Sequence, residues 1–218
     1  MNDTPILPIA SFPDLSLAKI TNNQGERLPR WEAQGAVYDL SFHLADSVPS
    51  EQLAIWREKR EQLQIVLSDP SGSETAKAAC RSEMSEVYNE HVERYLAAGH
   101  GECLLRDRVA AEAVAQVLEH DNGRLYALHA YTIMPNHLHI IVGGFNDTTL
   151  MKATIDQWKR ISAHAVNRVL GRSGDVWRRD AFTRIIRDRD EYVAKLKYAW
   201  NNPEAAGLSD GFLRKRFV

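Results

Sequence analysis

The 218-residue sequence lacks several features that would assign it to a large class of proteins. It has two cysteines, Cys80 and Cys103, which are too few for a disulfide framework or a zinc knuckle, so we expect both to be small core residues. No apolar run approaches membrane-spanning length, and the first residues do not join a basic stretch to an apolar one, so we expect a cytoplasmic protein. The sequence also has no Gly-x-x-x-x-Gly-Lys-Ser/Thr loop for nucleotide phosphates.

The formal net charge is only −2, but the charges are unevenly distributed along the chain. Residues 151–218 hold 15 Lys and Arg against 8 Asp and Glu, a net charge of +7, whereas the remaining residues hold 12 against 21. A basic C-terminal third on a nearly neutral protein favours a local anionic partner. A solvated helical surface would give the same pattern, so charge alone leaves both interpretations open.

Hydrophobic patterning predicts an α+β fold in which helices cover an antiparallel sheet. Apolar residues alternate in segment 35–46, and two further strands, 125–133 and 137–142, are joined by the tight turn Met134-Pro135-Asn136. Helical patterns cover segments 47–67, 74–98, 107–120 and 148–170. A short segment near 176–187 could be a strand, and a capping box at Asp188 and Glu191 begins a last helix, which we expect to end near Pro203.

We expect one domain, residues 34–208, with an extended arm before it, residues 1–33, and a basic tail after it, residues 209–218. Residues 47–105 would form a helical insertion after the first strand. The long helix at 148–170 has a stripe that we expect to pack on the sheet, formed by Leu150, Thr154, Trp158, Ile161, Ala165 and Val169.

Two histidines interrupt the second strand of the hairpin, in the stretch YTIMPNHLHIIV. Residues i and i+2 of a strand point the same way, so His137 and His139 share one face while Leu138 and Ile140 face the core. Two parallel imidazoles are half of a metal site. Two histidines on the solvated face of a sheet would give the same pattern.

The last helix carries a second polar pair, Tyr198 and Asn202, four residues apart and therefore on one helical face. A carboxamide oxygen is a hard ligand that could join the imidazoles, and a phenol one turn away could attack a phosphorus atom held by the metal. Taken singly, Tyr198 could equally be a half-buried packing residue, and Asn202-Pro203 could simply end the helix.

The combination of MPNHLHIIV with VWRRDAFTRIIRDRDEYVAKLKYAWNNPEAAGL resembles the single-tyrosine HUH transposases, and in particular the REP-associated tyrosine transposases of bacteria. The resemblance covers about residues 28–208. Two positions differ from the family pattern: Glu204-Ala205 follows Asn-Pro where Val-Lys is frequent, and Arg178 follows the tryptophan where Gln is common.

The resemblance implies an HUH core, a ferredoxin/RRM-like antiparallel sheet, and a metal-dependent single-stranded DNA endonuclease and strand transferase. His137, His139 and Asn202 would bind a divalent metal, Mg²⁺ or Mn²⁺, and Tyr198 would be the nucleophile. Cleavage would leave a 5′-phosphotyrosine intermediate and a free 3′-hydroxyl at hairpin-forming sequences.

Single-stranded or hairpin DNA is the partner that this chemistry requires, and basic side chains together with aromatic rings would bind it. The candidate basic contacts are Lys152, Lys159, Arg160, Arg178, Arg179, Arg184, Arg187 and Lys195. Trp177 and Trp200 could stack on bases, although each could also be a core residue. The sequence leaves open whether the active unit is a monomer or a homodimer.

Two alternatives remain on sequence alone. A domesticated protein could keep this fold and bind hairpin DNA without transposition activity. An unrelated metal-dependent hydrolase could use the two histidines with a carboxylate elsewhere in the chain.

Overall fold

The computed structural model describes residues 35–69, 92–145, 148–179 and 181–218, together with residue 12 and the short pieces 19–21, 30–32, 71–73, 75–77 and 79–80. The chain divides into two compact units. One unit comprises residues 46–102, and the other comprises residues 1–45 and 103–218. The larger of the two, which comprises residues 1–45 and 103–218, contains the five-stranded sheet and both polar pairs found in the sequence.

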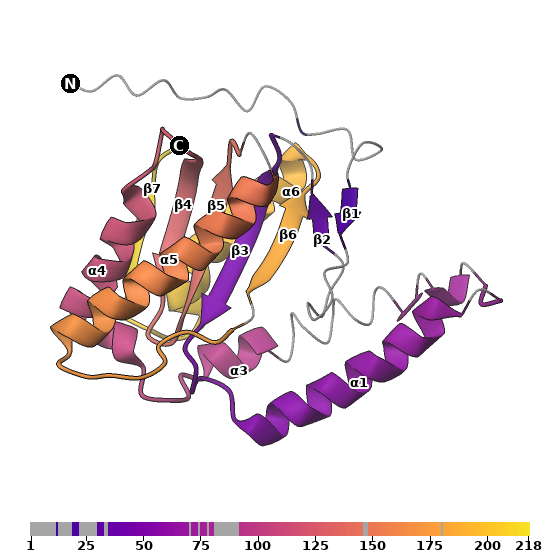
Figure 1. Ribbon diagram of the computed structural model, residues 1–218, viewed down its shortest axis with the longest axis horizontal. Helices are drawn as coiled ribbons and strands as arrows, with labels where there is room; N and C mark the ends of the chain where they lie inside the picture. Colours follow the sequence, from indigo (N-terminus) through magenta and orange to yellow (C-terminus); the bar gives the residue numbers. More distant parts are fainter. Residues whose placement is uncertain are drawn as a thin grey trace. The chain divides into compact units, whose positions relative to one another are not determined.

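A five-stranded antiparallel sheet organises the larger unit (Figure 1). Its strands are β3 (Val37–His43), β4 (Ala127–Ile133), β5 (His137–Gly143), β6 (Phe182–Ile186) and β7 (Leu213–Arg216). Their order across the sheet is β6-β3-β5-β4-β7. With α4 between β3 and β4, and α5 between β5 and β6, the first four strands follow the β-α-β-β-α-β arrangement of ferredoxin-like folds. The predicted α+β class is therefore confirmed.

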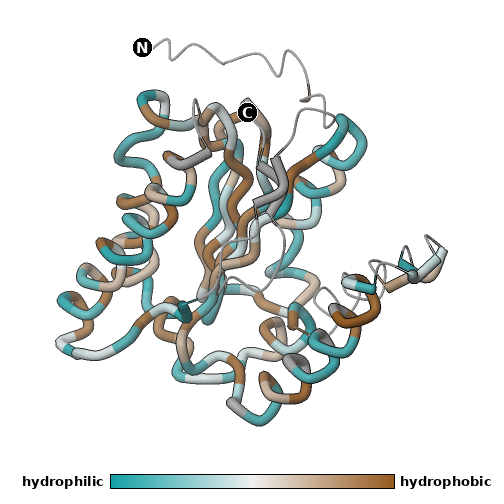
Figure 2. The backbone as a smooth tube through the Cα atoms, turned by 45° about the vertical axis from the view of Figure 1, so that its right-hand side comes forward, coloured by the Kyte–Doolittle hydropathy of each residue, from teal (hydrophilic) through white to brown (hydrophobic). Residues whose placement is uncertain are grey.

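The core fills the space between this sheet and two helices, α4 (Arg108–Glu119) and α5 (Thr148–Val169), which lie on the same face of the sheet in Figure 1. Alternate strand residues such as Leu40, Phe42, Leu138 and Ile140 are fully buried here. Figure 2 shows the matching hydrophobic stretches along the central strands. Because successive side chains alternate across a strand, the residues between these core positions face the other side of the sheet.

The predicted inner stripe of α5 is wrong in its C-terminal half. Ile161 and Val169 are exposed, whereas Ser162 and Val166 are buried on the sheet side. The serine is tolerated there because its hydroxyl donates to the carbonyl of Trp158 over 2.6 Å and accepts from Nε1 of Trp177 over 2.8 Å. A hydropathy pattern assigns serine to the solvent side of a helix. The prediction therefore failed at Ser162, because hydrogen bonds to other residues allow this serine to be buried.

The last helix, α6 (Arg189–Ala205), covers the opposite face of the sheet. Its N-terminus is capped as predicted, because the Asp188 side chain accepts a hydrogen bond from the backbone N–H of Glu191. The helix continues through Pro203 to Ala205, and Gly207 adopts a left-handed φ of 71° just beyond the end. Proline this close to the end removes one hydrogen bond without breaking the helix.

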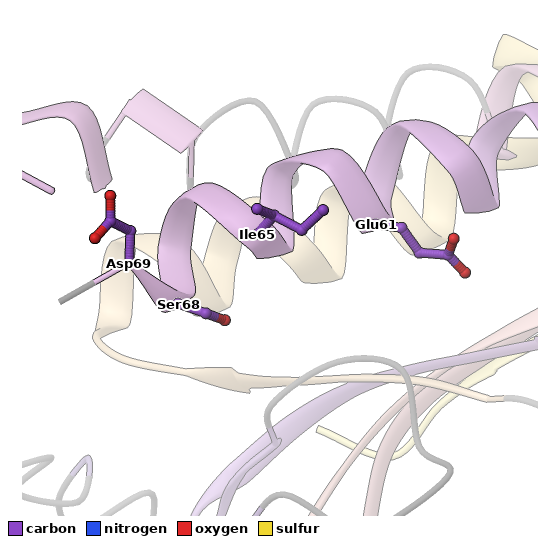
Figure 3. A pocket seen from close by; sticks show the side chains of 4 residues that line it. All are labelled: Glu61, Ile65, Ser68 and Asp69. Carbon is purple, nitrogen blue, oxygen red and sulfur yellow. The ribbon is translucent and has the colours of Figure 1, made fainter. Parts of the chain in front are cut away.

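The smaller unit is helical among its described residues. It contains α1 (Ser50–Ser68) and α3 (Glu93–Ala97), and a small cluster formed by Val48, Val92 and Leu96. One open hollow of about 580 Å³ lies along α1, lined by Glu61, Ile65, Ser68 and Asp69 (Figure 3). These four side chains follow one helical face and include no histidine, cysteine or basic residue, so the hollow shows no catalytic grouping.

Several predicted segments are described only in part. Of the arm at residues 1–33, the described pieces include β1 (Lys19–Thr21) and β2 (Arg30–Glu32), which pair antiparallel, and most of the rest lies outside the described residues. Residues 81–91 of the predicted helix at 74–98 also lie outside them. The predicted tail at 209–218 includes β7, which pairs with β4. None of the helices in the described ranges is long and apolar enough to cross a membrane.

Candidate functional site

The site begins on the sheet face that the main core leaves free. Leu138 and Ile140 enter the core, so His137 and His139 point to the other side, as the alternation of the strand predicts. Their ring centroids lie 5.0 Å apart, and each residue is only 2% exposed. The two imidazoles are therefore buried beneath another element and do not lie on a solvated sheet face, which removes the simplest alternative interpretation of the sequence.

Helix α6 is the element that covers them. The ring of Tyr198 packs edge-on against the imidazole of His139, with the two centroids 5.5 Å apart. One turn later, Asn202 lies within hydrogen-bonding reach of His137 and is 7% exposed. Tyr198 is 39% exposed, so a substrate can reach the phenol while the other three side chains stay covered. The structure thus brings together the four residues of the two polar pairs, across some sixty positions of sequence.

The protonation state of His137 suits a metal ligand. Burial lowers the pKa of this imidazole well below its ordinary value, and the nearby His139 and His43 lower it further, while the adjacent Asn202 side chain opposes the change. The ring is neutral at neutral pH, as ligation requires. Its Nδ1 lies 2.8 Å from Oδ1 of Asn136, and since that oxygen only accepts, Nδ1 carries the proton and Nε2 the lone pair.

Asn136 holds the His137 ring through this hydrogen bond, a contact that the sequence does not reveal, since there Asn136 reads only as part of a turn. Fixing the tautomer of a ligating histidine through its second nitrogen is the usual role of such a partner. The signal that could have found it is its place directly before the first histidine, with a short polar side chain at the start of the strand. Asn136 is 1% exposed, so this hydrogen bond is shielded from water.

The donor set fits a divalent metal. Oδ1 of Asn202 is buried and has no hydrogen-bond partner among the described residues, which leaves a hard oxygen donor beside two imidazoles. Nε2 of His139 is also buried without a hydrogen bond, although other atoms of this imidazole have neighbours, such as the Tyr198 ring. Among the described residues, no group of three His, Cys, Asp or Glu side chains could hold a metal ion by itself.

A buried ion pair joins α6 to the sheet next to the phenol. Nζ of Lys195 lies 2.7 Å from Oδ2 of Asp39 on β3, and their side chains are 19% and 7% exposed. The same ammonium lies 5.6 Å from the centroid of the Tyr198 ring. Lys195, Tyr198 and Asn202 follow at spacings of three and four residues, so one face of α6 carries the cation, the phenol and the carboxamide.

His43 is a third imidazole at this end of the sheet. It is paired with His137 in the β3–β5 register, so the two side chains lie on the same face. Its Nδ1 donates to the carbonyl of Leu44 over 3.2 Å. The alternation of apolar residues in segment 35–46 puts His43 on the polar face of this strand, but the sequence does not connect it with His137, because that contact depends on the strand order.

The eight candidate DNA-binding residues are spread over both faces of the sheet. Lys152, Lys159 and Arg160 lie on α5, across the sheet from the imidazoles. The ammonium of Lys159 donates to the backbone carbonyls of Arg178 and Arg179, at 2.7 and 2.9 Å. Lys159 therefore holds the segment before β6, and its predicted DNA contact stays a prediction.

The remaining basic candidates lie nearer to the site. The backbone N–H of Arg178 donates to the carbonyl of His43, which fixes Arg178 and Arg179 beside the end of β3. Arg184 and Arg187 both pair with the carboxylate of Glu191, at 2.7 and 3.1 Å. Lys195 is held by Asp39, as described above.

The two candidate stacking tryptophans differ in their surroundings. Trp177 is a core residue, packed edge-on against Phe42 at 4.9 Å. The guanidinium groups of Arg214 and Arg216 both contact the ring of Trp200 on α6, 4.3 and 4.4 Å from its centroid. These two arginines therefore contact α6 on the face of the sheet that carries the imidazoles, whereas Lys215 between them pairs with Glu119 on α4.

These features define a class: an α+β protein with a ferredoxin-like sheet that carries two imidazoles, a carboxamide and a partly exposed phenol beneath one helix. No family model matches the sequence, and no curated protein matches it. One solved structure that is similar is described as a REP-associated tyrosine transposase bound to a REP hairpin. The likeness covers 82% of this chain and 72% of that chain, with 14% sequence identity and a TM-score of 0.42.

Proposed function

We propose that this protein is a metal-dependent single-stranded DNA endonuclease and strand transferase that cleaves through a 5′-phosphotyrosine intermediate. The observation that supports this function is the contact of the exposed Tyr198 ring with His139, beside the buried oxygen of Asn202 that has no hydrogen-bond partner. The resemblance of the sequence to REP-associated tyrosine transposases suggests hairpin-forming DNA as the substrate.

His137, His139 and Asn202 would hold the divalent metal, Mg²⁺ or Mn²⁺. When bound, the metal would neutralise the negative phosphoryl oxygens and so make the phosphorus accessible to a nucleophile. Asn136 holds the His137 imidazole in the tautomer that presents Nε2. Burial beneath α6 keeps bulk solvent away from these side chains, so their dipoles and lone pairs act in a medium of lower polarity than water.

Tyr198 would supply the attacking oxygen. Its phenolic oxygen bonds to the phosphorus, the bond from phosphorus to the 3′-oxygen breaks, and the phenolic proton is transferred to the leaving 3′-oxygen, which becomes the free 3′-hydroxyl. The phosphodiester is exchanged for a phosphotyrosine ester, so attack by a 3′-hydroxyl reverses the step without a nucleoside triphosphate. Arg178 and Arg179, beside the end of β3, are the basic residues we expect to contact the strand nearest the site.

The test uses a labelled hairpin-bearing single strand, Mn²⁺ and detection of an SDS-stable protein–DNA adduct. Tyr198→Phe should abolish the adduct, and Tyr192→Phe is the matched control, because Tyr192 lies on the same helix but is buried. A double substitution of His137 and His139 by alanine should also abolish the adduct. An adduct that survives in Tyr198→Phe would refute the proposal. Retarded DNA without any adduct in the wild type would instead indicate a hairpin-binding protein without cleavage activity.

A further inference from the structure

A threonine on the neighbouring strand shares the site. Thr132 on β4 is paired directly with His139 in the β4–β5 register, so the two side chains lie next to each other on one face of the sheet. Tyr131 and Ile133, on either side of it in sequence, belong to the main core on the other face. Thr132 is therefore directed toward the layer that contains α6, and it is only 1% exposed.

The hydroxyl of Thr132 is an anomaly in this position. Its Oγ1 is buried and has no hydrogen-bond partner among the described residues. Buried polar groups are nearly always hydrogen-bonded, and valine would fill the same volume in a strand without desolvating a hydroxyl. Oδ1 of Asn202 is also buried without a hydrogen-bond partner among the described residues, and the Asn202 side chain lies close to His137, two residues from His139 on β5. Two independent polar atoms, from β4 and from α6, thus lack partners around one small region.

We infer that the Thr132 hydroxyl binds the hydration water of the divalent cation held by His137, His139 and Asn202. The inference rests on the proposed function and adds a residue to it: Thr132 would be a positioning residue that acts through water and does not ligate the cation itself. A hydroxyl suits this role because it donates one hydrogen bond and accepts two, and can rotate to follow the water. Such outer partners commonly change metal affinity by about 10–100-fold.

The experiment measures binding of Mn²⁺ alone, by calorimetry, to the full chain without DNA. Thr132→Val should weaken Mn²⁺ binding by about tenfold, the lower end of the effect of an outer partner, while leaving the urea midpoint of the metal-free protein unchanged or higher. Thr132→Ser keeps the hydroxyl and should bind Mn²⁺ within about twofold of the wild type, allowing for the looser serine rotamer.

The chain offers a matched control. Thr183 on β6 also has a buried Oγ1 without a hydrogen-bond partner in the described ranges, but it is paired with Leu40 and so lies on the core face of the sheet. Thr183→Val should leave Mn²⁺ affinity unchanged. Equal affinity of Thr132→Val and wild type would overturn the inference, as would an equal loss in Thr183→Val.

Three outcomes separate this inference from the proposed function. Wild-type protein that binds Mn²⁺, with a loss in Thr132→Val but no DNA adduct, supports the inference and overturns the cleavage proposal. Wild-type protein that forms the adduct, with no loss of affinity in Thr132→Val, overturns the inference alone. Wild-type protein that does not bind Mn²⁺ overturns both.

Discussion

The ion pair between Asp39 and Lys195 predicts a coupled effect on stability and on activity. Its atoms are 2.7 Å apart, and with side chains 7% and 19% exposed both charges are largely removed from water. Removing one partner of a buried pair typically costs about 3–5 kcal/mol, because the remaining charge is left without compensation. Lys195 keeps more exposure than Asp39, so Asp39→Asn should cost about 2–3 kcal/mol and Lys195→Met about 3–4 kcal/mol.

A double-mutant cycle separates the pair from the effects of each substitution. The double variant Asp39→Asn/Lys195→Met has no unpaired charge, so it should be more stable than the sum of the two single losses predicts, by about 1–3 kcal/mol. Urea unfolding followed by tryptophan fluorescence is the suitable assay, because four of the five tryptophans lie in the larger unit. Losses that simply add would refute the view that the two charges stabilise each other.

The same variants test whether the pair positions the nucleophile. Lys195 lies one turn before Tyr198 on the same face of α6, so loss of the pair frees the helix to shift over β5. A misplacement on the order of 1 Å can cost about 100-fold in rate. We expect the rate of adduct formation to fall by about 10- to 100-fold in Asp39→Asn, with Mn²⁺ affinity nearly unchanged. An unchanged rate at full occupancy of metal would contradict this role.

Three further predictions concern substitutions of single residues. Asn136→Ala should weaken Mn²⁺ binding by about 10-fold or more in calorimetry, because His137 loses the partner that fixes its tautomer. Burial lowers the pKa of His129 to about 4 from 6.5, so as the pH falls the unfolded chain binds the proton before the folded chain does. The stability that the folded protein has with neutral His129 is therefore complete above pH 6.5 and is lost as the pH falls toward 4. His129→Gln should therefore reduce the acid destabilisation measured by urea unfolding between these pH values, by about 3 kcal/mol in total at about 1.4 kcal/mol per pH unit. Lys159→Met should lower the urea midpoint, since two backbone carbonyls lose their donor, yet leave the salt dependence of DNA binding unchanged; a flatter salt dependence would instead support a phosphate contact.

Part of the site could be predicted because it depends on local geometry. Strand alternation requires His137 and His139 to share a face, and helical periodicity requires the same of Tyr198 and Asn202. The cap at Asp188 is likewise a local hydrogen bond, and it occurs where the capping box predicts it. The inner face of α5 was only partly predicted, since Ser162 is buried through a hydrogen bond with Trp177 that no hydropathy pattern contains.

Other features could not be predicted because they join segments far apart in the chain. The pairing of His43 with His137, and of Thr132 with His139, follows from the strand order β6-β3-β5-β4-β7. The contact of Asp39 with Lys195 requires that α6 lie over the face opposite to α4 and α5. A sequence pattern states which residues share a face of one element, and it does not state which face of another element they will meet.

The amino-acid sequence by itself thus determined the α+β class, the direction of the two imidazoles and the common face of phenol and carboxamide, since each depends on backbone geometry within a single element. Only the tertiary structure decided that these two faces meet, that the phenol stays reachable while the imidazoles are buried, and that a threonine hydroxyl and a lysine–aspartate pair surround them. The physical reason is that burial and the pairing of polar groups are properties of the space between elements, which exists only once the helix has packed on the sheet.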